Sequence, residues 1–301
     1  MILRSLYEIC FTYGIYTEFW LVIIRRQRKH GINQFMEIIF HGVRGSTPTA
    51  HQPFLQYGGN TTCTEIRLDQ FQFLFDAGTG FQNVEILKDR QVYLFFSHFH
   101  YDHIQGLPFN GAIFDPSNSV IISSGLVNAD DLKHVFTRAF QPMYFPIPLV
   151  ETLKNLRFTE FNKVQSNLQS SSNTAIEPIK LNHPGGASGY IITENGKKVC
   201  CFLDHEFGGD NDVDANLLSV ADGADLVIWD GMFLETELVS KKGWGHSSVE
   251  QGVSFAEKSC CKKIAIAHHA PNRTDEQLKE LENNLPSDNM FFAAEKMKII
   301  V

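Results

Sequence analysis

A run of six residues carries four side chains of the kinds that bind metal ions, and it follows closely on an apolar segment. The segment is Val92–Phe96, and the motif is His98-x-His100-x-Asp102-His103. A short segment that is apolar throughout is typical of a strand buried on both faces. Residues two apart on an extended chain point the same way, so His98 and His100 can reach one metal ion together, whereas Asp102 and His103 lie past a turn and can reach a second. This combination favours a sheet protein with a metal centre at the end of a buried strand.

Two metal ions need more ligands than this motif supplies, and three candidates follow further along the chain. His183 lies in a Gly/Pro turn, Asp204 comes directly after Val199–Leu203, and His268 comes directly after Lys263–Ala267. A carboxylate such as Asp204 can bridge two cations, which a single imidazole nitrogen cannot. Mixed histidine and carboxylate ligation predicts two divalent ions, with zinc expected and manganese or iron as alternatives.

The composition is that of a globular, acidic protein. The chain has 301 residues, of which 43% are hydrophobic, and its 26 Lys and Arg against 34 Asp and Glu give a formal net charge of −8. There is no basic excess to neutralise a run of phosphates, which argues against a long nucleic acid as partner. The 12 histidines are more than such a chain needs, in keeping with metal binding. The 6 cysteines include no C-x-x-C pair and are interpreted as reduced thiols in a cytoplasmic protein.

Short strand patterns alternate with turns and helix patterns from Met36 onward, without a linker or a repeat. The expected strands are Glu37–Phe40, Thr64–Leu68, Phe71–Phe75, Val92–Phe96, Gly189–Thr193, Val199–Leu203, Asp225–Trp229 and Lys263–Ala267. The expected helices are Ala129–Phe140, Ser247–Ser259 and Asp275–Glu282. Gln165–Asn173 is rich in Ser, Asn and Gln and is predicted to be a loop. Interleaved strands and helices predict one α/β layered domain over residues 36–301.

Residues 1–35 form an extension to this domain, for which three interpretations stay open. Leu6–Ile24 is mostly apolar, is about as long as a membrane span and is followed by a basic cluster. It can be a peripheral helix with one apolar face, a membrane anchor that leaves the rest of the chain in the cytoplasm, or sequence upstream of the true start at Met36. Glu8, Gly14 and Glu18 are costly in lipid, so membrane contact through residues 6–24 is not favoured.

The ligand motif and the three later candidates resemble the metallo-β-lactamase superfamily, over about Met36 to Pro271. The resemblance implies an αββα sandwich in a single domain, with a two-metal site at one edge of the sheets. It also favours His268 over the neighbouring His269 as a ligand, through its His-x-x-Pro spacing. The ligands it implies are His98, His100 and His183 for the first ion, Asp102, His103 and His268 for the second, and Asp204 as the bridge.

Further segments resemble the phosphodiesterase branch of this superfamily, which includes RNase Z, and a bacterial subgroup of hydrolases with the same fold. The segments that resemble the phosphodiesterase branch are Phe75–Gly80, Asp225–Met232 and Gly245–Ser248, and those that resemble the bacterial subgroup are Gly42–Ser46 and Gly58–Cys63. Ser248 stands where the branch usually has Thr, which is a mild departure. The match to the branch implies a metal-dependent hydrolase that acts on ester bonds.

The resemblance also implies roles for residues around the metal ligands. His246 would neutralise charge in the transition state or protonate the leaving oxygen, so Asp102 and His246 are the expected catalytic residues. Asp76 and Asp230 are expected to orient ligand histidines. Arg44 either contacts phosphate or is a structural loop residue.

The substrate is expected to be small. tRNA 3′-end nucleases of the resembled branch carry a long arm between the ligands that match His183 and Asp204, and here that interval is too short for one. The favoured substrate is a small phosphodiester, such as a cyclic nucleotide or cyclic dinucleotide, hydrolysed through a metal-bridging hydroxide. An RNase Z-like endoribonuclease and a hydrolase of lactone, thioester or β-lactam bonds are the alternatives. A homodimer is in keeping with the resembled branch.

Overall fold

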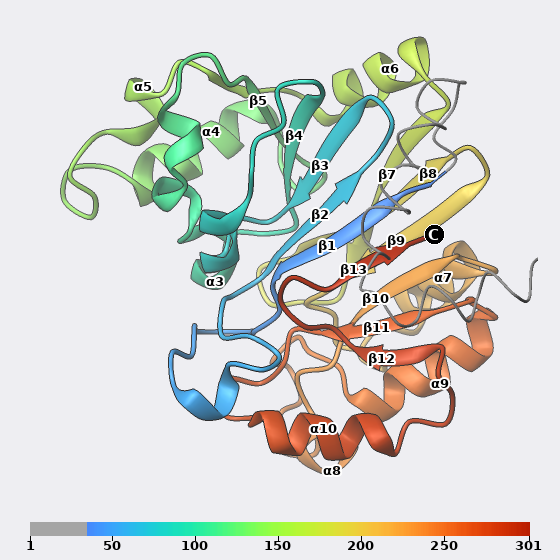
Figure 1. Ribbon diagram of the computed structural model, residues 1–301. Coiled ribbons are helices and arrows are strands. Elements are labelled where there is room, and N and C mark those ends of the chain that lie inside the picture. The colour runs from blue at the N-terminus through green and yellow to red at the C-terminus, as the bar shows by residue number, and fades with distance from the viewer. Residues whose placement is uncertain (1–34) are drawn as a thin grey trace, which may run out of the picture. The chain divides into compact units, whose positions relative to one another are not determined.

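Two β-sheets face each other in the computed structural model, which describes residues 35–301 (Figure 1). The interpretations of the N-terminal extension concern residues outside this range. The strands of the first sheet lie in the order β13 (Lys298–Ile300), β1 (Glu37–Gly42), β2 (Cys63–Arg67), β3 (Phe71–Phe75), β4 (Gln91–Phe96), β5 (Val120–Ser124) and β6 (Leu156–Phe158). Those of the second lie in the order β12 (Met290–Phe292), β11 (Ile264–Ala267), β10 (Leu226–Asp230), β9 (Lys197–Phe202), β8 (Ala187–Glu194) and β7 (Thr174–Leu181).

Alternation along β4 explains why this strand is apolar throughout. Tyr93 and Phe95 point into the core between the sheets, whereas Leu94 and Phe96 pack on the opposite face of their sheet. Phe73 of β3 meets Tyr93 and Phe95 edge-on, with ring centroids 5.6 and 5.3 Å away. The predicted strand buried on both faces is therefore confirmed.

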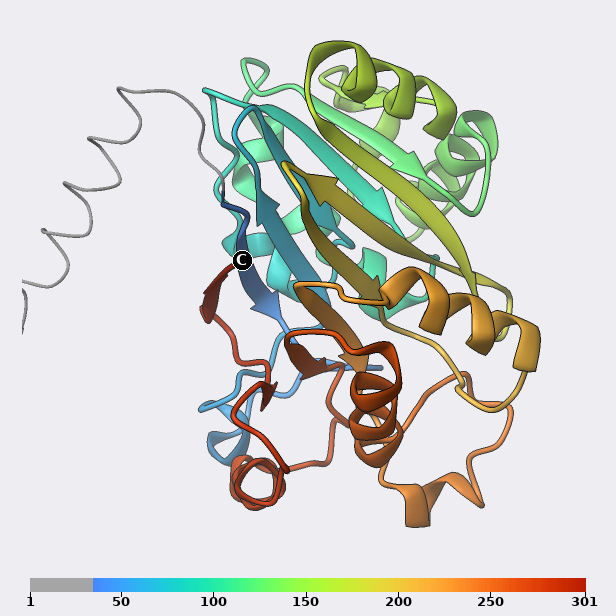
Figure 2. The ribbon, with the colours of Figure 1, turned by 90° about the vertical axis from the view of Figure 1, so that its right-hand side faces the viewer.

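Helices cover the outer faces of both sheets, which confirms the predicted αββα sandwich (Figure 2). Their bounds are α3 (Tyr101–Ile104), α4 (Ala129–Ala139), α5 (Leu149–Thr152), α6 (Phe161–Ser171), α7 (Asn211–Ala221), α8 (Glu235–Leu238), α9 (Val249–Ser259) and α10 (Asp275–Asn283). Short 3-10 helices are η1 (Gln52–Phe54), η2 (Thr79–Asn83), η3 (Leu107–Phe109) and η4 (Gly111–Phe114). Helices α4 and α5 pack on the first sheet, and α7 and α9 pack on the second. Within residues 35–301, none of the helices combines the length and apolarity needed to cross a bilayer.

The sequence does not predict strands β5, β6, β12 and β13, and two further elements differ from expectation for a clear physical reason. The predicted loop Gln165–Asn173 is wrong, because most of it lies in α6. Phe161, Val164 and Leu168 recur at helical spacing and are buried, so one apolar stripe anchors a helix whose other face is polar. Strand β7 contains Pro178, which makes a strand hard to recognise in sequence. As the edge strand of its sheet, β7 tolerates a residue without an N–H group.

Parallel pairing brings the chemically active residues to one edge of the sandwich. Strands β3 and β4 are parallel in the first sheet, and β9, β10 and β11 are parallel in the second. Parallel strands end at the same edge of their sheet. Asp76, His98, Asp204 and His268 come just after four of these ends, and Asp230 is the last residue of β10.

Candidate metal centre

The seven predicted ligands converge where the two sheets meet at this edge, and Asp230 and His246 belong to one of the same groups of donor atoms. Their donor atoms form overlapping groups in which all atoms lie within 4.8 Å of one another. One group is His98, His100 and His183, and another is Asp102, His103 and His268. The structure thus brings together the two sets that the family resemblance implies. Within the first set, the rings of His98 and His100 are 4.5 Å apart at their centroids, as expected for residues two apart on an extended segment.

Asp204 lies between the two sets and faces both. Its Oδ2 is 3.1 Å from Nε2 of His103, and its Oδ1 is 3.4 Å from Nε2 of His268. The same Oδ1 is 3.8 Å from Nε2 of both His98 and His183. A carboxylate placed in this way can contribute one oxygen to each of two cations.

Several donor atoms of the cluster are buried and make no hydrogen bond. Such atoms are expected where a metal ion binds, so they show whether the site fits metal ions. Among the described residues, Nε2 of His98, His103 and His268 and Oδ2 of Asp204 have no hydrogen-bond partner. An unsatisfied buried polar atom costs about 1–3 kcal/mol, and four converging ones are not expected by chance. Imidazole nitrogens with carboxylate oxygens are a donor set that suits zinc, manganese or iron. The residues present therefore fit divalent cations.

The other ring nitrogen of four of these histidines is fixed by a hydrogen bond outside the cluster. Each acceptor is a carboxylate, a carbonyl or a hydroxyl that donates its own proton elsewhere, so Nδ1 carries the hydrogen and Nε2 keeps a lone pair for a metal. The four bonds run from His98 to Ser97 Oγ (3.0 Å), from His103 to Asp76 Oδ2 (2.9 Å), from His183 to the Gly245 carbonyl (2.8 Å) and from His268 to Thr62 Oγ1 (3.0 Å). Of these acceptors, only Asp76 has the role that the sequence predicts for it.

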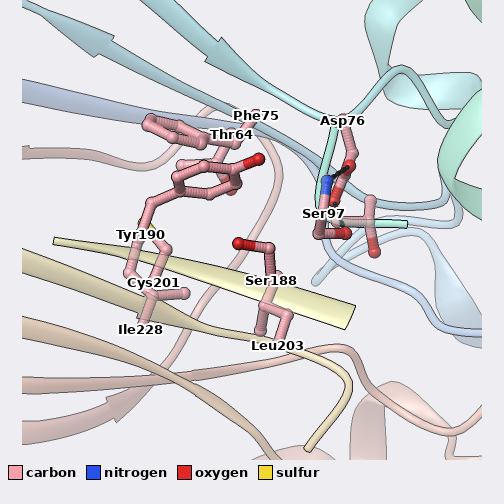
Figure 3. A pocket seen from close by; sticks show the side chains of 10 residues that line it. Thr64, Phe75, Asp76, Ser97, Ser188, Tyr190, Cys201, Leu203 and Ile228 are labelled. Atoms are coloured by element: carbon pink, nitrogen blue, oxygen red, sulfur yellow. Dashed lines mark hydrogen bonds between the residues drawn. The ribbon is translucent and has the colours of Figure 1, made fainter. Parts of the chain in front are cut away.

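Asp76 anchors two parts of this hydrogen-bond network. Its carboxylate accepts from the Ser97 backbone N–H and from Ser97 Oγ, both at 2.8 Å (Figure 3). It also accepts from His103. A cavity of about 20 Å³ lies beside these groups, lined in part by Tyr190 and Ser188. A space of this size accommodates a single water molecule. Asp76 thereby holds the supports of His98 and His103 in one rigid unit.

His246 stands beside the cluster and is held by Asp230. Its Nδ1 is 2.8 Å from Asp230 Oδ2, which also accepts from the Asp204 backbone N–H at 3.0 Å. Burial alone lowers the pKa of His246, but the nearby carboxylates, Asp230 first, raise it to about 9. The imidazole is therefore protonated at neutral pH in the metal-free protein. Asp230 thus contacts His246 and none of the histidines predicted as ligands.

The carboxylates of the cluster are ionised. Burial raises the pKa of Asp102, yet the neighbouring His103 and His268 bring it well below its usual range. Asp102 also accepts a 2.7 Å hydrogen bond from the Ser46 backbone N–H. The pKa of Asp204 is also held well below its usual range, because the neighbouring His103, His268 and His98 lower it by more than burial raises it. Both side chains thus keep the negative charge that a cation needs.

Three residues of the site have left-handed backbones. The φ angles of Asp76, Asp204 and His268 are 62°, 61° and 58°. Such a conformation costs about 1–3 kcal/mol for a residue other than glycine, although Asp and His tolerate it better than most. The turn at His268 directs its ring into the cluster. His269 points away, with Nε2 bonded to the Ala293 carbonyl at 2.8 Å.

Of the two roles predicted for Arg44, contact with phosphate or structural support of a loop, the structure shows the second. Its side chain is fully buried, and Nε donates to the Gly58 carbonyl at 2.7 Å. One terminal nitrogen donates to the carbonyls of Ala270 at 3.2 Å and Arg273 at 2.7 Å. Arg44 therefore ties together the loops that flank the cluster and is not available to phosphate.

Comparison with known proteins agrees with this arrangement. A family model described as "Beta-lactamase superfamily domain" matches residues 72–270, and no curated protein matches the sequence. The structure is similar to the metallo-beta-lactamase fold protein YhfI from Bacillus subtilis, with 15% identity, a TM-score of 0.65 and coverage of 89% of this chain and 99% of that one.

Two further structures share the fold. One is a diphosphatase from the PhnP family, with 14% identity, a TM-score of 0.62 and coverage of 89% of this chain and 97% of that one. The other is the short form of human tRNase Z, with 16% identity, a TM-score of 0.58 and coverage of 87% and 98%. The family match spans all seven residues of the cluster, and the chain therefore belongs to the beta-lactamase superfamily and has the metallo-β-lactamase fold.

Proposed function

We propose that the protein is a two-metal phosphodiesterase that hydrolyses a small phosphodiester, with a cyclic nucleotide or cyclic dinucleotide as the expected type. His98, His100 and His183 would hold one ion, Asp102, His103 and His268 the other, and Asp204 would contact both. Zinc is the proposed metal, with manganese or iron as alternatives. The observation that carries the proposal is Asp204, whose Oδ1 lies 3.8 Å from Nε2 of His98 and of His183 and whose Oδ2 lies 3.1 Å from Nε2 of His103.

The chain's own residues supply the rest of the chemistry. When bound, two divalent cations act as Lewis acids toward phosphoryl oxygens and lower the pKa of water. The two buried carboxylates offset part of the positive charge of the ions. His246 has Nδ1 fixed by Asp230, which leaves Nε2 for the substrate. From there it can protonate the leaving oxygen or neutralise charge that develops on the phosphoryl group.

The surroundings of the site support a small substrate. The interval between His183 and Asp204 is filled by the antiparallel hairpin of β8 and β9, which belongs to the second sheet. No arm protrudes there, and the formal net charge of −8 disfavours a long nucleic acid. The names of two similar structures, a diphosphatase and a tRNase Z, favour phosphorus–oxygen chemistry as the first to test.

The test is metal analysis followed by a panel of substrates. We expect about two divalent ions per chain and hydrolysis of bis-p-nitrophenyl phosphate and of a cyclic mononucleotide or dinucleotide. His98→Ala abolishes these activities, whereas His134→Ala, an exposed histidine on α4, leaves them unchanged. Cleavage of short RNA alone would support the endoribonuclease alternative, and cleavage of lactones, thioesters or β-lactams alone would support the other. The proposal fails if the metal-loaded protein cleaves no phosphodiester or if His98→Ala is fully active.

A further inference from the structure

A cavity of about 510 Å³ opens beside the metal centre and shares His246 with it. Its volume lies in the range of sites for small ligands. Ser46, whose backbone N–H contacts Asp102, also lines it, so the cavity borders the cluster. Phe233 and Trp244 contribute aromatic surface, and Lys241 and Arg273 contribute positive charge. We call this cavity the Trp244 pocket.

The aromatic rings of the pocket lead outward from the metal centre. His246 and Phe233 meet edge-on at a centroid distance of 5.8 Å, and Phe233 and Trp244 meet edge-on at 6.5 Å. Trp244 is 57% exposed, which is unusual for so large an apolar side chain. The Lys241 ammonium lies 4.0 Å from the centre of the Trp244 ring and helps to hold it. The indole is therefore a platform that no described residue covers fully.

The charges of the pocket favour an anionic ligand. Arg273 forms an ion pair with Glu237 at 2.6 Å, and this carboxylate also accepts from the Leu234 backbone N–H. The negative charge of Glu237 is thus neutralised by Arg273 within the wall of the pocket. The ammonium of Lys241 has no carboxylate partner among the described residues and lies over the rings of Phe233 and Trp244. The pocket has a net positive charge within an acidic protein.

The loop that carries Trp244 is fixed on both sides of the residue. The carboxylate of Glu206 accepts from the backbone N–H of Gly243 at 2.8 Å and of Gly245 at 2.9 Å. The Gly245 carbonyl in turn accepts from Nδ1 of His183, one of the proposed metal ligands. The position of Trp244 is thereby set relative to the metal centre, which lowers the entropic cost of binding a ligand to both.

We infer that the Trp244 pocket binds the nucleobase of a nucleotide substrate whose phosphate lies at the metal centre. This inference rests on the proposed function, because it places the phosphate beside His246 and the ligand cluster. A nucleotide combines an anionic phosphate with a planar ring, and the site offers cations at one end and an exposed indole at the other. Bases stack on aromatic side chains with little dependence on their identity. Trp244 is then a specificity residue, and phosphodiesters without an aromatic group are poor ligands.

The experiment measures binding of AMP and of ribose 5-phosphate to the metal-loaded protein by titration calorimetry. The two probes carry the same phosphate and sugar and differ only in the base. We expect AMP to bind about tenfold more tightly than ribose 5-phosphate, and Trp244→Ala to remove this difference. Trp244→Phe keeps a ring and retains most of the preference. Val239→Ala is the matched control, since Val239 is 90% exposed on the same segment and does not line the pocket.

The result separates this inference from the proposed function. Equal binding of the two probes by the unmodified protein overturns the inference, as does a preference for AMP that survives Trp244→Ala. Either result leaves the proposed phosphodiesterase function standing, because that function is tested separately with bis-p-nitrophenyl phosphate. Conversely, a Trp244-dependent preference for AMP in a protein that cleaves no phosphodiester refutes the proposed function and leaves a nucleotide-binding site.

Discussion

The Nδ1 atom of His183 and the carbonyl oxygen of Gly245 lie 2.8 Å apart, so a metal-site histidine is oriented by a backbone group 62 residues further along the chain. Gly245 has a φ of +85°, and a Cβ added there would lie 2.1 Å from His183 Nδ1. Gly245→Ala should therefore displace His183 and weaken metal binding about 10- to 100-fold, as measured by competition with a chelator.

The neighbouring Gly243 provides a control for this substitution. Its φ is +84°, and a Cβ there would meet no atom within 4 Å. Gly243→Ala thus introduces the same backbone strain without the contact to His183. If the two variants lose metal to the same extent, the contact between Gly245 and His183 is not what orients the ligand.

His246→Ala should reduce kcat for a phosphodiester by about 10²- to 10⁴-fold, the usual loss on removing a general acid. Metal content should stay unchanged, because His246 lies beside the two ligand sets and its Nδ1 is already bonded to Asp230. Steady-state kinetics and metal analysis on the same preparation check both statements. A variant that loses one metal ion together with its activity would show His246 to be a ligand instead.

Removal of metal should lower the stability of the protein. The buried Nε2 atoms of His98, His103 and His268 have no partner in the described residues, so a bound cation satisfies groups that folding otherwise leaves unpaired. A metal present at 1,000 times its Kd adds about 4 kcal/mol to the free energy of unfolding. Thermal unfolding with and without a chelator measures this difference. A His98→Ala/His103→Ala double variant should show no chelator effect, and an equal effect in both proteins would contradict a site at this cluster.

The buried carboxylate of Glu65, which is not one of the predicted metal ligands, should make stability depend on pH. Burial raises its pKa, but hydrogen bonds with His41 at 2.8 Å and Arg67 at 2.6 Å bring it below the ordinary value. Because the pKa is lower in the folded state, the stabilisation is present above about pH 4.3 and is lost as the pH falls through the folded pKa.

Urea unfolding between about pH 3 and pH 7 tests this dependence. Glu65→Gln should reduce the free energy of unfolding at pH 7 by roughly 1.5–3 kcal/mol and flatten its decline in acid. Glu280→Gln, on the exposed face of α10, is the matched control and should change neither quantity. An unchanged acid slope in Glu65→Gln would mean that other carboxylates dominate the pH dependence.

The candidate metal centre could be predicted in detail because its residues stand where a sequence is most informative. His98, Asp204 and His268 each follow a short apolar run, and parallel strands with these endings must meet at one edge of a sheet. Spacing within the motif around His98 predicts that His98 and His100 point the same way, whereas the assignment of the other ligands to each ion comes from the family resemblance. The layered fold followed from the same alternation of apolar runs and helix patterns.

The contacts that loops make could not be predicted. Thr62 and His268 are 206 residues apart in sequence, and only the folded chain shows that they hydrogen-bond. The Trp244 pocket depends on the path of the loop that precedes His246, which periodicity does not determine. Helix α6 was obscured by its polar composition, since three apolar residues suffice to anchor it.

At Asp76, Asp204 and His268, where the backbone is left-handed, the residue type that serves activity differs from the one that would make the fold most stable. Glycine adopts this conformation without cost, so His268→Gly should fold into a more stable metal-free protein than His268→Ala does. Yet glycine cannot bind a metal ion. Attempts to stabilise the protein by choosing the residues that best suit its backbone at these three positions would therefore remove parts of the metal centre, and an engineered thermostable form must gain its stability elsewhere in the sandwich.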